Sequence, residues 1–180
     1  VNSRGIRDIE SSTVTSEFGG KFSDELTKRE FLDYIRLETG YPFELYDLDK
    51  IRLAINDKNF KLSLNCEKLL EPFQGSNNFQ FNGNSNVLVL KANQEILSIA
   101  GILVNKKFEY DNNTKSLLVE ASIFNSKQIR QISRTIGVRT DRSSMYEKGL
   151  NSTYLIESLC RFLYLLKSLN NKISIKNILS

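Results

Sequence analysis

Hydrophobic positions recur along the chain at two spacings, one typical of helices and one typical of strands. The helical spacing, in which apolar residues return every three or four positions, predicts three amphipathic helices. These cover residues 27–38, 126–136 and 154–169. Gly40 and Gly137 follow the first two directly and are expected to end them, since glycine readily adopts the left-handed conformation of a helix C-terminus.

Short apolar or alternating runs predict strands. They cover residues 87–90, 96–104, 107–110, 116–122 and 172–178. Two further runs, 51–55 and 61–64, flank a polar turn and predict a hairpin. The Gly-, Ser- and Asn-rich stretch 75–86 predicts a surface loop. Strands and helices follow one another without a regular βαβ rhythm, which favours an α+β fold with a largely antiparallel sheet and a few packed helices.

The first residues of the chain have little hydrophobic periodicity. We expect residues 1–26 to form an irregular N-terminal arm or linker. Residues 27–180 are long enough to bury one sizeable core, as one domain or as two halves that share a core. The chain starts at Val1 rather than Met, and its last residues continue a strand-like pattern. We therefore expect a domain cut from a longer polypeptide.

Composition excludes several classes of function. The chain contains no His, which removes every Ser-His or Cys-His nucleophile scheme. Cys66 and Cys160 lie far apart without a CxxC pattern, so neither a zinc site nor a disulfide framework is expected. No apolar run has the length of a membrane span, and no membrane partner is expected. The net charge of +4 is compatible with nucleic acid nearby but does not demand it.

The run from Gly137 to Asn151, GVRTDRSSMYEKGLN, is unusually dense in charges, hydroxyl groups and glycine. Ordering such a connector is costly, which is reasonable where it holds a site or a domain joint together. Arg139, Asp141, Glu147 and Lys148 are candidates to brace the joint between two helices through buried ion pairs.

Four motifs, in order and with matching spacing, resemble one known family. GVRTDRSSMYEKGLN resembles the pattern G-L-R-T-x-A-S-x-R-F-E-K-G-V-D, and SLLVEASIFNSKQIRQISRTIG resembles V-L-L-E-A-A-x-F-x-P-x-x-I-R-R-T-A-R-x-L-G. ILSIAGILVN is similar to A-L-A-G-I-M-G-G, and YIRLETGYPFELYDLDKI to Y-V-M-L-E-L-G-Q-P-L-H-A-Y-D-L-D-K-I. These patterns are those of the B3/B4 domain of the bacterial-type phenylalanyl-tRNA synthetase beta subunit, and the resemblance extends from about Phe31 to the C-terminus.

The resemblance implies a part in charging tRNA with phenylalanine. In that family the alpha subunit performs aminoacylation, and the B3/B4 domain hydrolyses wrongly made tyrosyl-tRNA in a second pocket that accepts the extra hydroxyl. The implied partners are the alpha subunit, the remaining domains of the beta subunit, and tRNA. ATP and magnesium are implied for the complete enzyme, with no cofactor or metal in this domain. A plastid stroma is the expected compartment, with a bacterial cytoplasm as the alternative.

Some residues of the family's editing pocket are kept. Glu120 corresponds to the glutamate that recognises the tyrosyl hydroxyl, although a strand-end carboxylate in an ion pair is an equally good interpretation of it. Ala100 and Gly101 correspond to the small residues that approach the pocket, and Thr140 to the threonine of the signature run.

Other residues depart from the family's pattern. Glu44 replaces the histidine that helps to place substrate and water, and when ionised it would repel Glu120 if the two are close. Val104 replaces a glycine that leaves room for the amino acid, with Asn105 in place of the next glycine. Arg142 replaces a small alanine, and overfilling a packed pocket costs about 1 to 3 kcal/mol or excludes the ligand. Leu32 and Asp33 replace a Thr-Asn pair in the family's V-D-I-T-N-Y helix, and Met145 replaces an arginine of the signature pattern.

Three functions follow from these residues. The first is a structural module of the ligase with a degenerate editing pocket, and the second is an editing hydrolase that still works through Glu120 with Glu44. The third is an RNA-binding module whose contacts would be basic. They would be Lys106, Lys107, Lys127, Arg130 and Arg134. Charges on an exposed helix face are more often only solvated.

Overall fold

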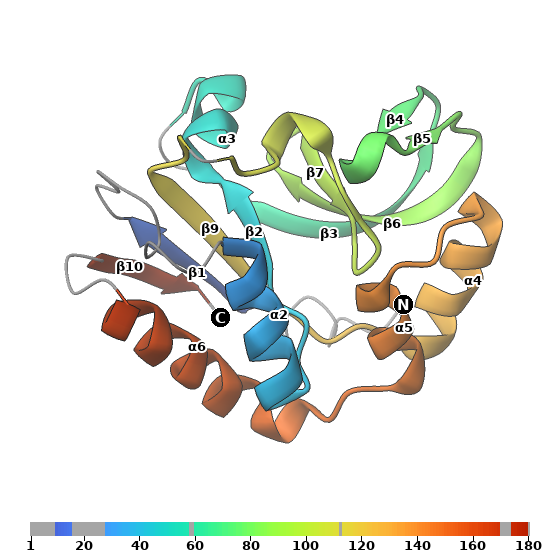
Figure 1. Ribbon diagram of the computed structural model, residues 1–180. Coiled ribbons are helices and arrows are strands. Elements are labelled where there is room, and N and C mark those ends of the chain that lie inside the picture. The colour runs from blue at the N-terminus through green and yellow to red at the C-terminus, as the bar shows by residue number, and fades with distance from the viewer. Residues whose placement is uncertain (1–9, 16–27, 58–59, 112, 170–173, 180) are drawn as a thin grey trace. The chain divides into compact units, whose positions relative to one another are not determined.

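The computed structural model describes residues 10–15, 28–57, 60–111, 113–169 and 174–179 (Figure 1). The chain divides into two compact units, each assembled from separate stretches of the sequence. The first unit includes Lys50–Glu109 and Phe124–Gly149, and the second includes Arg7–Asp49, Tyr110–Ile123 and Leu150–Ser180. Each unit has its own antiparallel sheet, which confirms the expected α+β class.

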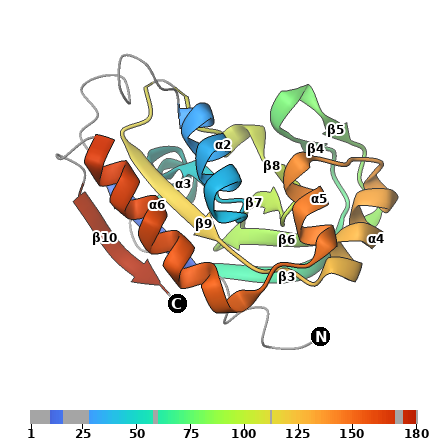
Figure 2. The ribbon, with the colours of Figure 1, turned by 60° about the horizontal axis from the view of Figure 1, so that its bottom comes forward.

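The second unit is a four-stranded sheet with two helices against one face. The sheet order is β10 (Ser174–Leu179), β1 (Glu10–Thr15), β9 (Ser116–Ala121) and β2 (Glu44–Asp47), and neighbouring strands are antiparallel. The covering helices are α2 (Lys28–Thr39) and α6 (Leu155–Leu169), preceded by the short 3-10 helix η3 (Ser152–Tyr154) (Figures 1 and 2). Both helices lie within two residues of the ranges that hydrophobic spacing predicts.

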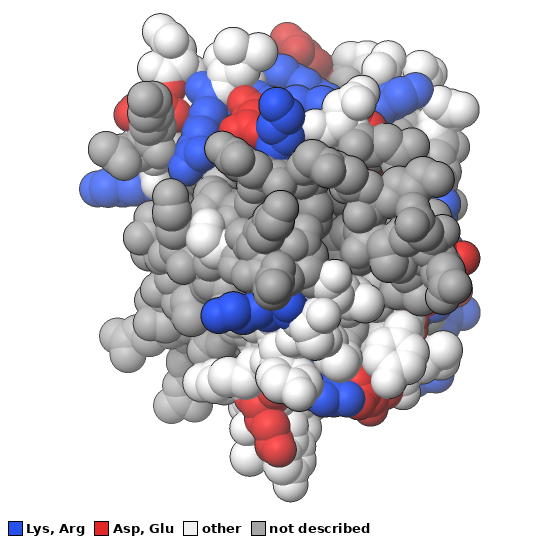
Figure 3. Space-filling model, turned by 60° about the vertical axis from the view of Figure 1, so that its left-hand side comes forward, with Lys and Arg blue, Asp and Glu red and all other residues white. Residues whose placement is uncertain are grey.

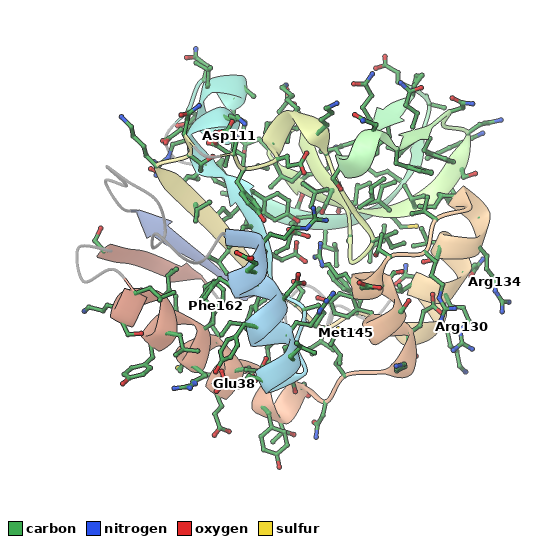
Figure 4. The ribbon with its side chains drawn as sticks, in the orientation of Figure 1. Glu38, Asp111, Arg130, Arg134, Met145 and Phe162 are labelled. Atoms are coloured by element: carbon green, nitrogen blue, oxygen red, sulfur yellow. The ribbon has the colours of Figure 1, made fainter. Side chains whose placement is uncertain are left out.

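Alternation along β9 separates the two faces of this sheet. Leu117, Val119 and Ala121 point into the core under the helices, because side chains alternate along a strand. At the centre of that core the ring of Phe162 lies 5.2 Å from Phe31 and 5.0 Å from Phe43 (Figure 4). The residues between them on β9, including Glu120, therefore lie on the opposite face.

The first unit is a second four-stranded sheet, in the order β3 (Leu62–Leu69), β6 (Ser85–Ala92), β7 (Glu95–Ile99) and β8 (Leu103–Val104). It also contains α4 (Ser126–Ile136) and α5 (Asp141–Lys148). The stretch 73–81 carries small pieces only: β4 (Phe73–Gln74), η1 (Ser76–Asn78) and β5 (Gln80–Phe81). The predicted surface loop thus has short paired segments, and β6 begins at its end.

Helix α4 forms as its spacing predicts. Ile129, Ile132 and Ile136 are buried on one face, and Gly137 ends the helix in the left-handed conformation with a φ of 71°. The N-cap is Asn125, whose side chain accepts hydrogen bonds from the amides of the first turn.

The predicted hairpin at residues 51–64 is wrong. Residues 51–55 belong to helix α3 (Leu48–Ile55), and 62–64 begin β3, which pairs with β6. A five-residue apolar run has no clear periodicity of its own, and Leu48 with Ile51 supplies the buried i, i+3 pair of a helix. Asn56 has a φ of 55°, a conformation that asparagine tolerates at a helix end.

Two other strand predictions need correction. Residues 96–104 form β7 and β8 with a turn between them, because Gly101 adopts a φ of 71°. Residues 106–108 form the 3-10 helix η2 (Lys106–Phe108) rather than a strand, with the Asn105 side chain as its N-cap. Short polar caps of this kind override a strand-like apolar pattern.

Part of the expected irregular arm is regular. Residues 10–15 form β1, which pairs with β10 on one side and β9 on the other. Pairing along both edges supplies the backbone hydrogen bonds that local sequence does not specify. The rest of the arm lies outside the described residues, as does Thr27, the first residue of the helix expected at 27–38. No helix among the described residues is long and apolar enough to cross a membrane.

Candidate functional site

Two of the residues singled out from the sequence lie together in the second unit. Glu44 of β2 is the direct partner of Glu120 of β9 in the antiparallel register. Directly opposite residues project on the same face of a sheet, with Cβ atoms about 4.5 to 5.5 Å apart. The sheet therefore brings two carboxylates close together, as the sequence comparison of Glu44 with the family's histidine anticipates.

Glu120 is 1% exposed and accepts a hydrogen bond on Oε2 from the hydroxyl of Tyr46. Tyr46, itself fully buried, lies two residues after Glu44 and so shares its face of β2. The sequence analysis did not select Tyr46, although the period-2 spacing from Glu44 is a signal that could have found it. A buried carboxylate needs such a donor, because desolvation disfavours its charge.

Glu44 is half-buried and turns partly toward its own strand. Its Oε1 accepts a hydrogen bond of 3.1 Å from the amide of Leu45. An ionised carboxylate has no proton to donate, whereas an imidazole can donate and accept at the same time. Two carboxylates directly opposite each other across a strand pair are an unfavourable combination when both are ionised.

In the first unit, Ala100 and Gly101 form the turn between β7 and β8. The Ala100 amide donates to the Leu88 carbonyl at 2.8 Å, so the turn is anchored on β6. A Cβ at Gly101 would lie 2.9 Å from the Phe124 ring and 3.1 Å from Ile129. Gly101 is therefore required by packing and by its positive φ, whatever else it does.

Val104 and Asn105 follow this turn and are built into the fold. Val104 is 6% exposed and pairs with Ser98 on β7. The Asn105 side chain donates to the Ile96 carbonyl at 2.8 Å and accepts from the Lys107 amide at 3.0 Å. The residues that replace two glycines of the family pattern thus fill space and make structural bonds.

Thr140 is the N-cap of α5. Its hydroxyl accepts from the Ser143 amide at 3.1 Å while the Ser143 side chain accepts from the Thr140 amide, which is a capping box. The Thr140 hydroxyl also donates to the Ile102 carbonyl at 3.2 Å. The conserved-looking threonine therefore ties α5 to the β7–β8 turn, and the signature run is largely a set of helix caps.

Arg142 lies in the first turn of α5 and is 8% exposed. Its guanidinium lies 5.9 Å from the centroid of the Tyr146 ring, a cation–π arrangement that suits arginine. Met145, on the same helix, is half-buried (Figure 4). A buried arginine thus occupies a position where the family pattern has a small residue.

The predicted brace of the signature run is partly correct. Glu147 pairs with Arg139 at 3.4 Å and also with Arg130 of α4 at 3.6 Å, a partner that the sequence analysis assigned to RNA. The Glu147 side chain is 8% exposed, but the arginine side chains are 67% and 53% exposed. The pairs are therefore not buried on both sides, and their strength is reduced by solvent.

The two departures on α2 have structural roles. Leu32 packs partly buried against the core of the second unit. Asp33 pairs with Arg36 one turn later at 2.9 Å on the helix surface. Neither side chain makes a recognisable ligand-binding arrangement with another described residue.

The basic residues considered for RNA are mostly engaged within the first unit. Lys107 pairs with Glu95 at 2.8 Å, and Lys106 donates to the Asn78 side chain at 2.7 Å. Arg130 and Arg134 point outward from α4 (Figure 4). Figure 3 shows a different side, the one at the left in Figure 1, where acidic side chains lie beside basic ones among the described residues. On that side the mixed charge lacks the single sign of a typical nucleic-acid footprint.

A metal centre and a ligand pocket are two other kinds of candidate site. No group of three or more Cys, Asp or Glu side chains in the described part of the chain could hold a metal ion. One small polar cavity of about 110 Å³ lies in the first unit. Its lining is Gln74, Gly75, Asn78, Phe79, Gln80 and Lys106, and it includes none of the predicted site residues.

The fold and these motifs place the chain in a known class of domain. A family model described as the B3/4 domain matches residues 30–171, and the chain belongs to that family. The expected resemblance is thereby confirmed.

Particular relatives extend the comparison. The chain is 44% identical over 141 residues to the chloroplastic phenylalanine–tRNA ligase beta subunit of Phaeodactylum tricornutum, covering 78% of this chain and 20% of the relative. It is 29% identical over 181 residues to the phenylalanine–tRNA ligase beta subunit of Prochlorococcus marinus, covering 92% of this chain and 22% of the relative. The chain therefore spans about a fifth of the length of these relatives.

One similarity is of a different kind. A stretch of 41 residues is 80% identical to part of GTP cyclohydrolase 1 of Flavobacterium johnsoniae. It covers 23% of this chain and 18% of that protein, too little of either to define a family. The assignment therefore rests on the B3/4 match, which spans most of the chain.

Proposed function

We propose that this chain is the B3/4 domain of a phenylalanine–tRNA ligase beta subunit, retained mainly as a structural module with little or no tyrosyl-tRNA editing. The ligase part of the proposal is supported by relatives that carry this name. By that relationship, an alpha subunit and tRNA would be its partners, and ATP and magnesium would act in the complete enzyme. The chloroplastic relative favours a plastid, with a bacterial cytoplasm as the alternative.

The observation that carries the loss of editing is the register of Glu44 against Glu120. A hydrolytic site needs a group that positions water or the substrate ester, and that group must lie within hydrogen-bonding reach. The second carboxylate takes the family's histidine position, and when ionised it cannot donate a proton. Val104 and Arg142, which replace small residues of the family pattern, also support a loss of editing.

The structural role itself is supported by what the signature residues do. Gly137 ends α4, Thr140 begins α5, and Glu147 connects both helices through arginines. These contacts need no ligand. A domain under selection for architecture alone would keep them while its pocket residues changed.

The test is hydrolysis of preformed tyrosyl-tRNA by the complete alpha–beta enzyme. We expect a rate near the uncatalysed one, because a positioned acid–base group contributes about 10² to 10⁴ in rate and Glu44 stands in place of the family's histidine. Aminoacylation with phenylalanine, measured on the same preparation, controls for correct assembly. The combined variant Glu44→His, Val104→Gly and Arg142→Ala should increase hydrolysis.

An active editing hydrolase is the second candidate, favoured by the buried and hydrogen-bonded Glu120. It predicts rapid hydrolysis by the unmodified enzyme and its loss in Glu120→Ala. That pair of results would overturn the loss of editing without affecting membership of the ligase. The RNA-binding alternative gains no specific observation, since Lys106, Lys107 and Arg130 already have protein partners.

A further inference from the structure

Large apolar side chains are exposed on both helices of the second unit. On α6, Ile156 is 59% and Tyr164 is 65% exposed, and the exposed Cys160 lies between them. These residues are spaced by four, so they form one row along the outer side of the helix. On α2, Leu37 is 82% and Tyr34 is 50% exposed, one turn apart. We call these five residues the α2–α6 face.

The two rows are held side by side by an ion pair between the helices. The Arg161 guanidinium of α6 donates to Oε1 of Glu38 on α2 from both Nη2, at 2.7 Å, and Nε, at 3.0 Å (Figure 4 labels Glu38). Paired geometry of this kind fixes orientation as well as distance. Tyr34 on α2 and Tyr164 on α6 both lie next to the Arg161 guanidinium, so the two rows meet at this ion pair.

The charge of the face is balanced. The hydrogen bond that Arg161 donates to Glu38 raises the pKa of Arg161, and the carboxylate neutralises the charge of the guanidinium. The same guanidinium lies 5.6 Å from the Tyr164 ring centroid. A surface without net positive charge does not attract a phosphate backbone, which favours an apolar protein partner over tRNA.

Single exposed apolar residues need no explanation, but a contiguous group marks an interaction site. Leu53 of α3, 83% exposed, is a single exposed apolar residue in the other unit. The α2–α6 face is a group of such residues. The partner it fits is a helix or sheet surface with apolar residues at its centre and polar ones around it.

We propose that the α2–α6 face is an intramolecular docking surface for another domain of the beta subunit. The occupant follows from length, because the matched stretch makes up only 20% and 22% of the two related beta subunits, so most of such a subunit lies outside the part that this chain matches and is available to cover the face. The proposal rests on the proposed function, in that it requires the chain to be part of a longer beta subunit. It does not depend on whether editing survives.

The test uses the two cysteines of this chain, which lie in different units and are both exposed here. The complete alpha–beta enzyme is treated with N-ethylmaleimide, and peptide mass spectrometry measures the rate at which Cys160 and Cys66 are alkylated. Each rate in the native enzyme is compared with the rate of the same cysteine in urea. We expect Cys160 to react at least about tenfold more slowly in the native enzyme, because a docked surface must open before reagent enters. A Cys160 as reactive as in urea would overturn the proposal.

A matched pair of variants separates docking from general instability. Leu37→Asp places a charge on the α2–α6 face, and Leu53→Asp places one on a helix position of equal exposure elsewhere. We expect Leu37→Asp, but not Leu53→Asp, to restore the alkylation of Cys160. Equal effects would overturn the proposal, as would protection of Cys160 that appears only when tRNA is added. Aminoacylation and tyrosyl-tRNA hydrolysis, measured in parallel, test the proposed function separately.

Discussion

At the scale of single residues, the hydroxyl groups of buried tyrosines have specific acceptors. Tyr46 donates to Glu120 and Tyr41 donates to the Asn151 carbonyl, each across a long stretch of sequence within the second unit. Such bonds cannot be inferred from periodicity, because the acceptor is chosen by strand register and chain path. They make individual substitutions informative.

Tyr46→Phe removes the donor to a buried carboxylate and leaves the rest of the ring in place. We expect the free energy of unfolding to fall by about 1 to 3 kcal/mol, the cost of a buried polar group without its partner. Urea unfolding followed by circular dichroism measures this. Tyr154→Phe, at a 55% exposed position, is the control and should change stability by less than about 0.5 kcal/mol. Equal effects would contradict the role given to Tyr46.

Tyr41 predicts a dependence of stability on alkaline pH. Burial raises the pKa of the Tyr41 hydroxyl, so the folded state holds this proton more tightly than the unfolded chain. The contribution of the protonated Tyr41 hydroxyl to the free energy of unfolding is therefore fully present below the unfolded tyrosine pKa of about 10 and is lost as the pH rises further. The free energy of unfolding, measured between pH 9 and about 11, should fall less steeply with pH in Tyr41→Phe than in the unmodified chain. An unchanged slope would reject this.

At the scale of elements, turns and helix caps determined whether a short apolar run formed a helix, one strand or two strands. The run 96–104 is divided by Gly101, and the run 51–55 becomes a helix that ends at Asn56. The long helices were predicted closely because their burial is repeated over several turns. Short segments were not, since a few apolar residues fit either a helix or a strand.

Gly101 and Gly137 share a φ of 71°, so substituting each by alanine separates the cost of backbone strain from the cost of a packing clash. At Gly137 a new Cβ would meet no atom within 4 Å, so Gly137→Ala should cost only the left-handed strain of about 1 to 2 kcal/mol. At Gly101 the Cβ would lie 2.9 Å from Phe124, and Gly101→Ala should cost about 1 to 3 kcal/mol more. Chemical unfolding of both variants measures the difference, and equal costs would show that the turn can relax.

At the scale of the whole molecule, charge is balanced rather than concentrated. The chain has 25 Lys and Arg against 21 Asp and Glu, and several of the basic residues considered for RNA already bind protein groups. We infer that this domain does not by itself form a phosphate-binding surface.

This predicts weak binding of tRNA by the isolated chain, with little dependence on salt. Each phosphate that a protein neutralises contributes about 0.7 to 0.9 to the slope of log affinity against log salt. A filter-binding titration between low and moderate salt should therefore give a slope near zero. A slope indicating several phosphate contacts, reduced in Arg134→Ala, would revive the RNA-binding alternative.

The sequence by itself determined the family, the α+β class and the long helices. Each of these depends on a pattern that repeats locally or on motifs read in order, so local information suffices. The correspondence of Glu120 and the differing residues to the family's editing pocket stays a prediction from the sequence.

Only the tertiary structure decided which of these residues meet. Strand register placed Glu44 opposite Glu120 and Tyr46 within reach of its carboxylate, and the pairing of β1 between β9 and β10 made a strand of residues expected to be irregular. It also converted the signature run from a candidate site into a series of helix caps. Register and long-range pairing join residues far apart in the chain, and their energy depends on neighbours that no local pattern contains.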